Sequence, residues 1–169
     1  MSDNQVLDAI HARRSVREFE DRDVPDEIIE KIIEAGTWAP SGLNNQPWRF
    51  IVVKKGEKKG ALAKLTHYGH IIESAPVCIL VFLDAKASYD RTKDIMAIGA
   101  CNQNILLGAH SLGLGGVWLG EILKKKSDVK ELLQAPASYE LMAVLALGYP
   151  TQKKRTSSRK DARGVTFNP

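Results

Sequence analysis

Apolar residues recur along the chain with helical spacing in some segments and in short unbroken runs in others. Isoleucines between Pro25 and Gly36 follow a helical spacing, and the proline and glycine suit the two ends of that helix. An earlier helix is predicted to start at Asp3 as its cap and to run into the Arg13–Arg14 pair. Three further helices are predicted around Leu62 and Leu65, from Asp94 to Leu112, and near Asp128 to Leu133.

The apolar runs predict the strands of a sheet. Val77 to Leu83 is apolar throughout, which indicates a central strand buried on both faces. Other strands are expected from Trp48 to Val53, around Val117, and from Leu141 to Leu147. The helix from Asp94 to Leu112 is apolar on nearly every side, so we expect it in the core or at an interface.

The sequence changes character after Pro150, where a polar and basic tail begins. This tail could be disordered, but Val165 to Phe167 is apolar enough to add a strand to a sheet of a partner subunit. The tail therefore leaves two interpretations open.

Composition indicates one globular domain over residues 1–169. Hydrophobic residues make up 44% of the chain and charged residues 26%, which argues against a disordered or fibrous protein. No apolar run is long enough to span a bilayer and no leader opens the chain, so we expect a cytoplasmic protein. Cys78 and Cys101 lie in apolar contexts without CxxC spacing, which indicates buried free thiols.

The net charge of +4 is unevenly distributed. Arg13, Arg14 and Arg17 lie together with Ser15 where a helix is predicted to end, a density that suits a phosphate group. A solvated basic turn explains this pentapeptide equally well when it is considered alone. A second basic group lies in the tail and consists of Lys153, Lys154, Arg155, Arg159, Lys160 and Arg163.

A loop from Pro40 to Trp48 carries the other candidate binding groups. Its prolines stiffen the backbone, and its amide side chains both donate and accept, as reading the edge of a flavin or nucleotide ring requires. An ordinary Asn-rich loop is the alternative.

Other motifs give weaker indications. The segment from Gly113 to Gly120 resembles a dinucleotide-binding glycine fingerprint. However, Trp118 occupies the position of the third glycine, and the segment follows a predicted helix instead of a strand, so we reject that interpretation. His67, His70 and Glu73 have the spacing of metal ligands, yet Gly69 interrupts them and no further ligand follows, so we expect surface residues and no metal. No nucleophile motif is present, which favours chemistry carried by a cofactor.

Taken in order, four segments of the chain resemble the nitroreductase family: Arg13 to Phe19, Ala39 to Trp48, Gly113 to Gly120, and Gly148 to Pro150 with the basic tail. The resemblance implies an α+β fold whose central, mainly antiparallel sheet is flanked by helices. It also implies a homodimer with two FMN sites at the subunit interface, contacts through the long apolar helix, and exchange of a C-terminal strand at Val165 to Phe167.

The resemblance also assigns roles to individual residues. Arg13 and Ser15 would contact the FMN phosphate and ribityl chain with Arg14 beside them, and Arg17 would approach the pyrimidine side of the ring as the nearest to a catalytic side chain. Leu119 and Gly120 would lie with their backbone against the reactive nitrogen of the ring. The loop from the other subunit would contribute Pro40, Ser41, Gly42, Asn44 and Gln46.

The tail departs from the family pattern, in which a lysine and an arginine usually approach the phosphate. Arg159 matches the arginine, and the lysine is missing, with Lys153, Lys154 or Arg155 as replacements in an unsettled register. The chain also has only the stretch from Asp84 to Lys93 where many relatives insert helices, which implies an open substrate pocket.

The function implied is an FMN-dependent oxidoreductase that takes hydride from NADH or NADPH and passes it by a ping-pong cycle to nitroaromatics, quinones or free flavin. A reductive dehalogenase or another flavin-site enzyme of the same fold is the first alternative. A nucleic-acid-binding module is suggested by the pI of about 9.1, but aromatics make up only 7% and none lies from Lys153 to Arg163.

Overall fold

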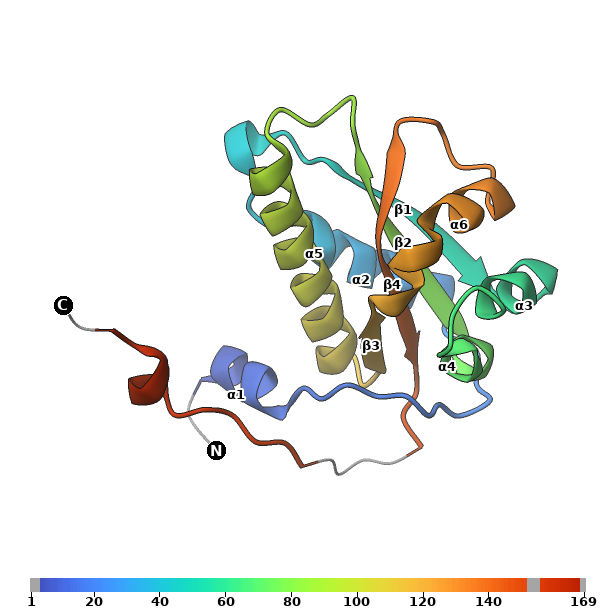
Figure 1. The fold of residues 1–169 in the computed structure, drawn as a ribbon. Helices are drawn as coiled ribbons and strands as arrows, with labels where there is room; N and C mark the ends of the chain where they lie inside the picture. The colour runs from blue at the N-terminus through green and yellow to red at the C-terminus, as the bar shows by residue number, and fades with distance from the viewer. Residues whose placement is uncertain (1–3, 152–155, 168–169) are drawn as a thin grey trace.

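The computed structural model describes residues 4–151 and 156–167, and its centre is a four-stranded antiparallel sheet (Figure 1). The strands follow the spatial order β1-β2-β4-β3. Their bounds are β1 Trp48–Lys54, β2 Val77–Asp84, β3 Gly115–Leu119 and β4 Tyr139–Gly148. The expected α+β fold with an antiparallel sheet is confirmed.

The two middle strands, β2 and β4, carry the core. All eight residues of β2 are buried, as an apolar run predicts for a strand covered on both faces. One face packs against α2 (Asp26–Thr37) and α5 (Arg91–Ser111), and the other packs against α3 (Glu57–Ala63), α4 (Gly69–Ser74) and α6 (Lys126–Leu132) (Figure 1).

The remaining helical elements are short and lie at the edges of this body. The first helix, α1 (Gln5–Ala12), has no buried residue, and the side chain of Asn4 caps it by accepting from the backbone of Val6 and Leu7. Asp3, which the sequence suggested as the cap, lies outside the described residues. Three 3-10 turns complete the structure: η1 Gly42–Asn44, η2 Glu121–Lys125 and η3 Ala162–Val165.

Two details differ from the sequence prediction, and a third is not tested by a single chain. Pro25 is the residue before α2 and does not open its first turn. The helix α4 was not predicted, because Gly69 at its start weakened the helical pattern there. In the single chain, η3 ends at Val165 and Phe167 is exposed, and the strand expected there requires a partner subunit.

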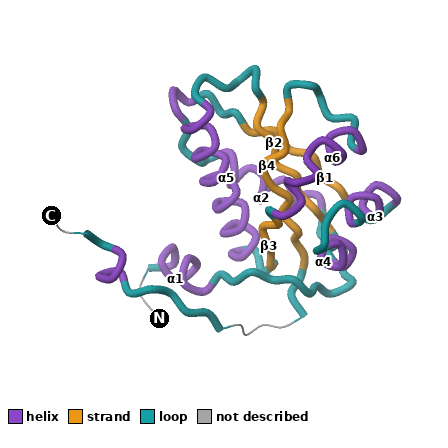
Figure 2. The backbone as a smooth tube through the Cα atoms, in the orientation of Figure 1, coloured by secondary structure: helices purple, strands orange, loops and turns teal. Residues whose placement is uncertain are grey.

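The tail leaves the body after β4, and residues 156–167 are all exposed (Figure 2). Exchange of this segment with a partner subunit stays a prediction. Cys78 and Cys101 are buried free thiols, as expected. Within the described residues, no helix is both long and apolar enough to cross a membrane.

Candidate functional site

An extended arm, residues 13–20, joins α1 to the main body and crosses beneath the sheet (Figure 2). The backbone N–H of Val16 donates to the carbonyl of Gly116 in β3 at 3.0 Å, and Ser15 pairs with Gly116 in a parallel bridge. Val16 packs directly over Gly115, where a side chain would collide with it. This glycine therefore lets the arm lie against the edge strand.

A basic cluster of Arg13, Arg14 and Arg159 forms at the start of the arm. Burial lowers the pKa of Arg13, and the positive charges of Arg159 and Arg14 lower it further. No carboxylate of residues 4–151 and 156–167 forms an ion pair with any of the three. Partly buried positive charges without a counterion are unfavourable, so the cluster suits an anion such as a phosphate.

The arginines of the cluster are not equivalent. Arg14 folds back on its own backbone, and its Nη1 donates to the carbonyls of His11 at 2.5 Å and Arg13 at 2.8 Å. Its Nε is buried without a partner among the described residues. The guanidinium of Arg14 thus bonds to the backbone at the end of α1, and no such bond is made by the guanidinium of Arg13 among the described residues.

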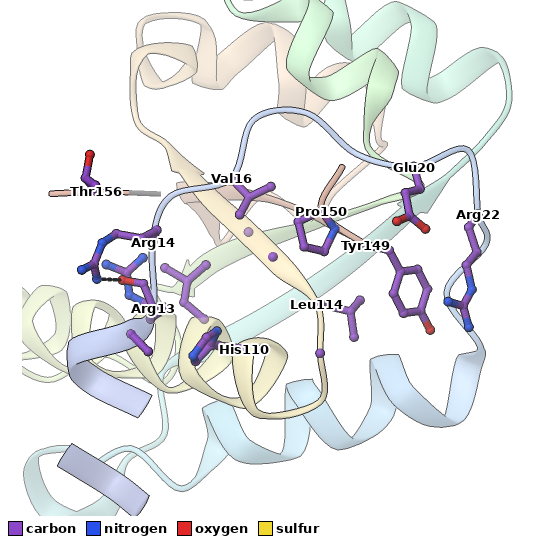
Figure 3. A pocket seen from close by; sticks show the side chains of 15 residues that line it. Arg13, Arg14, Val16, Glu20, Arg22, His110, Leu114, Tyr149, Pro150 and Thr156 are labelled. Carbon is purple, nitrogen blue, oxygen red and sulfur yellow. Dashed lines mark hydrogen bonds between the residues drawn. The ribbon is translucent and has the colours of Figure 1, made fainter. Parts of the chain in front are cut away.

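A cavity of about 760 Å³ opens beneath the arm. Figure 3 shows Arg13, Arg14 and His110 on one side and Tyr149 and Arg22 on the other. Burial lowers the pKa of His110, and the nearby Arg13 and Arg14 lower it further, so this imidazole is neutral at pH 7. Among the predicted site residues that the structure describes, only Arg13 and Arg14 line this cavity. Lys153, Lys154 and Arg155, the candidate replacements for the missing lysine, lie outside the described residues.

Arg22 lies with its guanidinium carbon 3.8 Å from the ring centre of Tyr149, a cation–π contact that orders the far end of the cavity. The segment from Gly113 to Gly116, which leads into β3, also lines the cavity. The cavity thus has arginines at both ends: Arg13 and Arg14 at one, and Arg22 stacked on Tyr149 at the other.

The far end of β3 carries Leu119 and Gly120. Leu119 is buried within the strand, and Gly120 is exposed just after it. Gly116, which holds the arm, precedes Leu119 by three residues, or about 10 Å along a strand. Glu121 then accepts from the Thr66 hydroxyl at 2.7 Å, and this bond, more than any other cause, holds the pKa of Glu121 below its ordinary value.

Arg17 extends from the arm into solvent. Its guanidinium forms no ion pair with a carboxylate of the described residues. The two neighbours of this arginine differ, because Val16 is buried and Glu18 is exposed. The anchoring of Val16 therefore turns Arg17 away from the core and leaves it available to a bound molecule.

The loop of residues 40–47 holds an unusual backbone conformation. Leu43, Asn44 and Gln46 all have positive φ angles, at 53°, 54° and 47°. Such angles cost about 1–2 kcal/mol for each residue with a side chain, so the surrounding contacts must impose them. One of these contacts joins the N–H of Gln46 to the hydroxyl of Ser41 at 3.1 Å, and Leu43 is 87% exposed.

The loop and the basic cluster lie at opposite ends of α5. Asn45 of the loop donates to Asp94 in the first turn of the helix, whereas His110, close enough to the cluster for its arginines to lower its pKa, is in the last turn. The helix between Asp94 and His110 is about 24 Å long. One chain therefore does not bring the two predicted halves of the site together.

Two features of this region were not predicted from the sequence. His110 was not recognised because a histidine near the end of an apolar helix resembles an ordinary helix terminus. Asp94 was noted only as the beginning of a helix, and its bond to Asn45 joins residues that are 49 positions apart. No short-range pattern indicates such a pair.

Comparison with known proteins identifies the family. A model described as the nitroreductase family matches residues 10–69 and 63–149. The chain belongs to the nitroreductase family. This nitroreductase-family chain is 46% identical to a candidate nitroreductase of Desulfovibrio desulfuricans that was solved in complex with FMN, with 99% of both chains covered and a TM-score of 0.93.

Two curated relatives agree with this nitroreductase assignment. A candidate NADH dehydrogenase/NAD(P)H nitroreductase of Methanothermobacter thermautotrophicus is 37% identical over 92% of this chain and 83% of its own length. The NADPH-flavin oxidoreductase of Vibrio harveyi is 31% identical over 96% of this chain and 72% of its own length. The family predicted from the sequence is therefore confirmed.

Proposed function

We propose that residues 1–169 form one FMN-binding domain of a homodimeric NAD(P)H oxidoreductase that reduces electron-poor acceptors such as nitroaromatics, quinones or free flavin. The FMN-dependent oxidoreductase class agrees with the names of its relatives and with the FMN-bound structure of the D. desulfuricans protein. The observation that carries the proposal is the partly buried Arg13, which lies beside Arg14 and the exposed Arg159 and has no counterion among the described residues.

The arm and β3 supply complementary groups to the cofactor. Arg13 and Arg159 hold the phosphate through charge-assisted hydrogen bonds, and the Ser15 hydroxyl donates a further one. At the other end, the backbone of Leu119 and Gly120 would lie against the ring. The bound flavin supplies the hydride chemistry, which leaves the protein to bind, orient and tune it.

Arg17 is the nearest side chain to a catalytic group. Its guanidinium is exposed. Near the pyrimidine side of a bound flavin ring, it would stabilise the negative charge that accompanies reduction. No side chain is needed as an essential acid or base, because water can deliver the proton.

The second half of each site comes from the partner subunit. The loop of residues 40–47 lies too far from the basic cluster of its own chain, and a second copy related by a twofold axis can bring it there. Exposed apolar side chains support this association. They are Val6, Leu7 and Ile10 on α1, Trp38 after α2, and Ile95 and Met96 on α5.

The acceptor site is open, because only a short connection, residues 85–90, joins β2 to α5. NADH or NADPH and the acceptor use this one site in turn, which gives ping-pong kinetics. The reductive dehalogenase alternative is not favoured, since the three relatives described above carry nitroreductase or flavin oxidoreductase names.

Purification tests the proposal directly. We expect a yellow protein that releases one FMN per chain on denaturation and that oxidises NADH or NADPH when a quinone or nitroaromatic is added. A colourless protein that also fails to bind added FMN contradicts the proposal. If the same protein instead retained nucleic acid through its basic tail in a salt-dependent way, the nucleic-acid-binding alternative would replace it.

A further inference from the structure

Asp94 is a fully buried carboxylate that the proposed flavin site does not use. It lies in the first turn of α5 and accepts four hydrogen bonds. Its Oδ1 accepts from Asn45 Nδ2 at 2.7 Å. Its Oδ2 accepts from the Ser88 hydroxyl at 2.6 Å and from the backbone N–H groups of Tyr89 and Asp90 at 3.2 and 3.4 Å.

Asp94 is not the cap of its own helix. The side chain of Asp90 performs that task by accepting from the backbone N–H of Lys93 at 3.0 Å. Burying a carboxylate costs free energy unless its oxygens accept hydrogen bonds. The four donors around Asp94 offset that cost. Burial by itself raises the pKa of Asp94, but the hydrogen bonds from Ser88, Asn45, Asp90 and Tyr89 outweigh it and bring the pKa below its ordinary value.

The bond from Asn45 reaches the centre of the strained loop. Asn45 stands between Asn44 and Gln46, which both have positive φ angles. Both of its amide hydrogens are used, because Nδ2 donates to the carbonyl of Ala87 at 2.9 Å as well as to Asp94. A flipped amide would set its oxygen against these two acceptors, so the orientation of Asn45 is fixed.

A second contact joins the same two loops. The phenol of Tyr89 lies so close to Gly42 that any side chain at position 42 would collide with it. Within the loop, Pro47 is buried, whereas no residue from 41 to 46 is. Polar contacts therefore hold residues 41 to 46. Local bonds join Ser41 and Arg49 to Gln46. Asn45 and the contact with Tyr89 tie the segment to the 85–90 connection and to Asp94.

We propose that Asp94 is a positioning residue that, through Asn45 and the 85–90 connection, holds the loop of residues 40–47 in the left-handed conformation in which it contacts the flavin ring bound by the partner subunit. This inference rests on the proposed function for its ligand. The loop geometry that Asp94 imposes can be measured without any cofactor.

The test compares Asp94→Asn with Asp90→Asn as the matched control. Asn at position 90 still caps α5, whereas Asn at position 94 lacks the charge and presents an amide group to donors. Hydrogen exchange of the backbone amides from 41 to 46 is measured on the protein freed of FMN. We expect Asp94→Asn to accelerate hydrogen exchange in this loop at least about tenfold (about 1.4 kcal/mol) and to leave the exchange rates of β2 and β4 unchanged. Asp90→Asn should leave the exchange rates of the loop unchanged.

Flavin binding provides the second readout. Asp94→Asn is expected to raise the dissociation constants of FMN and riboflavin by the same factor, at least about tenfold, because the loop faces the ring and not the phosphate. A variant at Arg13 should weaken FMN alone. A purely structural role for Asp94 would lower the melting temperature without this shared loss of ring affinity.

If Asp94→Asn fails to fold, Asn45→Ala gives the answer. It removes the bonds from the loop to Asp94 and to the carbonyl of Ala87, and it leaves the other three donors of Asp94 in place. The proposal would be overturned if both variants kept hydrogen-exchange rates in the loop and flavin affinities within about twofold of the wild type. If Asp94→Asn does not fold, the same result in Asn45→Ala alone would overturn it. Failure of the wild-type chain to bind FMN would instead overturn the proposed function. In that event the exchange experiment still decides whether Asp94 orders the loop.

Discussion

Arg14 donates its Nη1 to the backbone carbonyl of Arg13 at 2.8 Å, and this bond separates the tasks of two adjacent arginines. The guanidinium of Arg14 donates to backbone carbonyls at the end of α1. The guanidinium of Arg13 is partly buried and faces two other cations, with no carboxylate of the described residues to balance it. Truncation of these two adjacent arginines should therefore have different effects on FMN affinity and on stability.

Arg13→Ala should therefore weaken FMN binding by about ten- to a hundredfold, the loss expected for a charge-assisted hydrogen bond. The chain freed of FMN should not lose stability, because removal of Arg13 relieves its repulsion with Arg159 and Arg14. Titration of FMN fluorescence and thermal unfolding measure the two effects. Riboflavin, which lacks the phosphate, should bind both proteins equally.

Arg14→Ala is the matched comparison and should show the opposite pattern. Its loss removes two bonds that close α1, so we expect about 1–2 kcal/mol lower stability and a smaller effect on FMN affinity than Arg13→Ala. If Arg14→Ala lowered FMN affinity more than Arg13→Ala, the assignment of the phosphate to Arg13 would be wrong.

His110 should report on the anion in the basic cluster. Its pKa is lowered by burial and by Arg13 and Arg14. A bound phosphate offsets the positive charge of these arginines, so the pKa of His110 should rise toward its ordinary value of about 6.5 when FMN binds. Titration of the imidazole signals by NMR, assigned with His110→Gln, measures this change, and an equal or lower pKa in the FMN complex would contradict it.

The lowered pKa of His110 also determines how the stability of the folded chain changes with pH. Below pH of about 6.5, the unfolded chain protonates this histidine while the folded chain resists, so the free energy of unfolding falls as pH decreases. The loss continues until the pH passes the lower pKa of the folded state. His110→Gln should therefore lose less stability than the FMN-free wild type between pH 7 and pH 5, as chemical denaturation at each pH would show.

Arg17→Ala should slow reduction of the flavin by NADH or NADPH. Without the guanidinium, the negative charge that accompanies reduction loses a stabilising cation, and a rate about ten- to a hundredfold lower is expected. Arg17→Lys keeps the charge and should retain most of the rate. Stopped-flow absorbance of the flavin makes the measurement, and an unchanged rate in Arg17→Ala would remove the catalytic role from this residue.

The sequence predicted the sheet well because burial and periodicity agree there. Val77 to Leu83 is apolar at every position, and a strand buried on both faces is the structure that such a run permits in a sheet. The tail was harder to predict, because Val165 and Phe167 can form a strand only where an edge strand is available to pair with them. Sequence alone shows their apolar character but not the presence of a partner.

The candidate site was predictable in its composition but not in its geometry. Arginines and amides indicated the segments that are proposed to bind the cofactor. The different surroundings of Arg13 and Arg14, by contrast, depend on the direction that each guanidinium takes in the folded chain. The positive φ angles of Leu43 and Gln46 are also absent from any local pattern, because these residue types ordinarily avoid them. They follow from contacts such as that between Asn45 and Asp94, which only the folded chain brings together.

The proposed division of each site between two chains predicts that two variants with different defects restore FMN binding when they form a mixed dimer. Arg13→Ala damages the phosphate half, and Gly42→Val damages the loop half because its side chain collides with Tyr89. Each homodimer then has two damaged sites. A mixed dimer has one site with both defects and one site with none, since the twofold axis pairs the intact arm of one subunit with the intact loop of the other.

Co-expression of the two variants in equal amounts should therefore restore about a quarter of the wild-type FMN sites, because half of the dimers are mixed and each of these contains one intact site. FMN content is measured at a concentration that leaves both parent homodimers empty, and dimer formation is verified separately. The control mixes Arg13→Ala with Arg159→Ala, two defects that both affect the phosphate half. If each chain instead bound FMN with its own arm and its own loop, neither mixture would recover any sites.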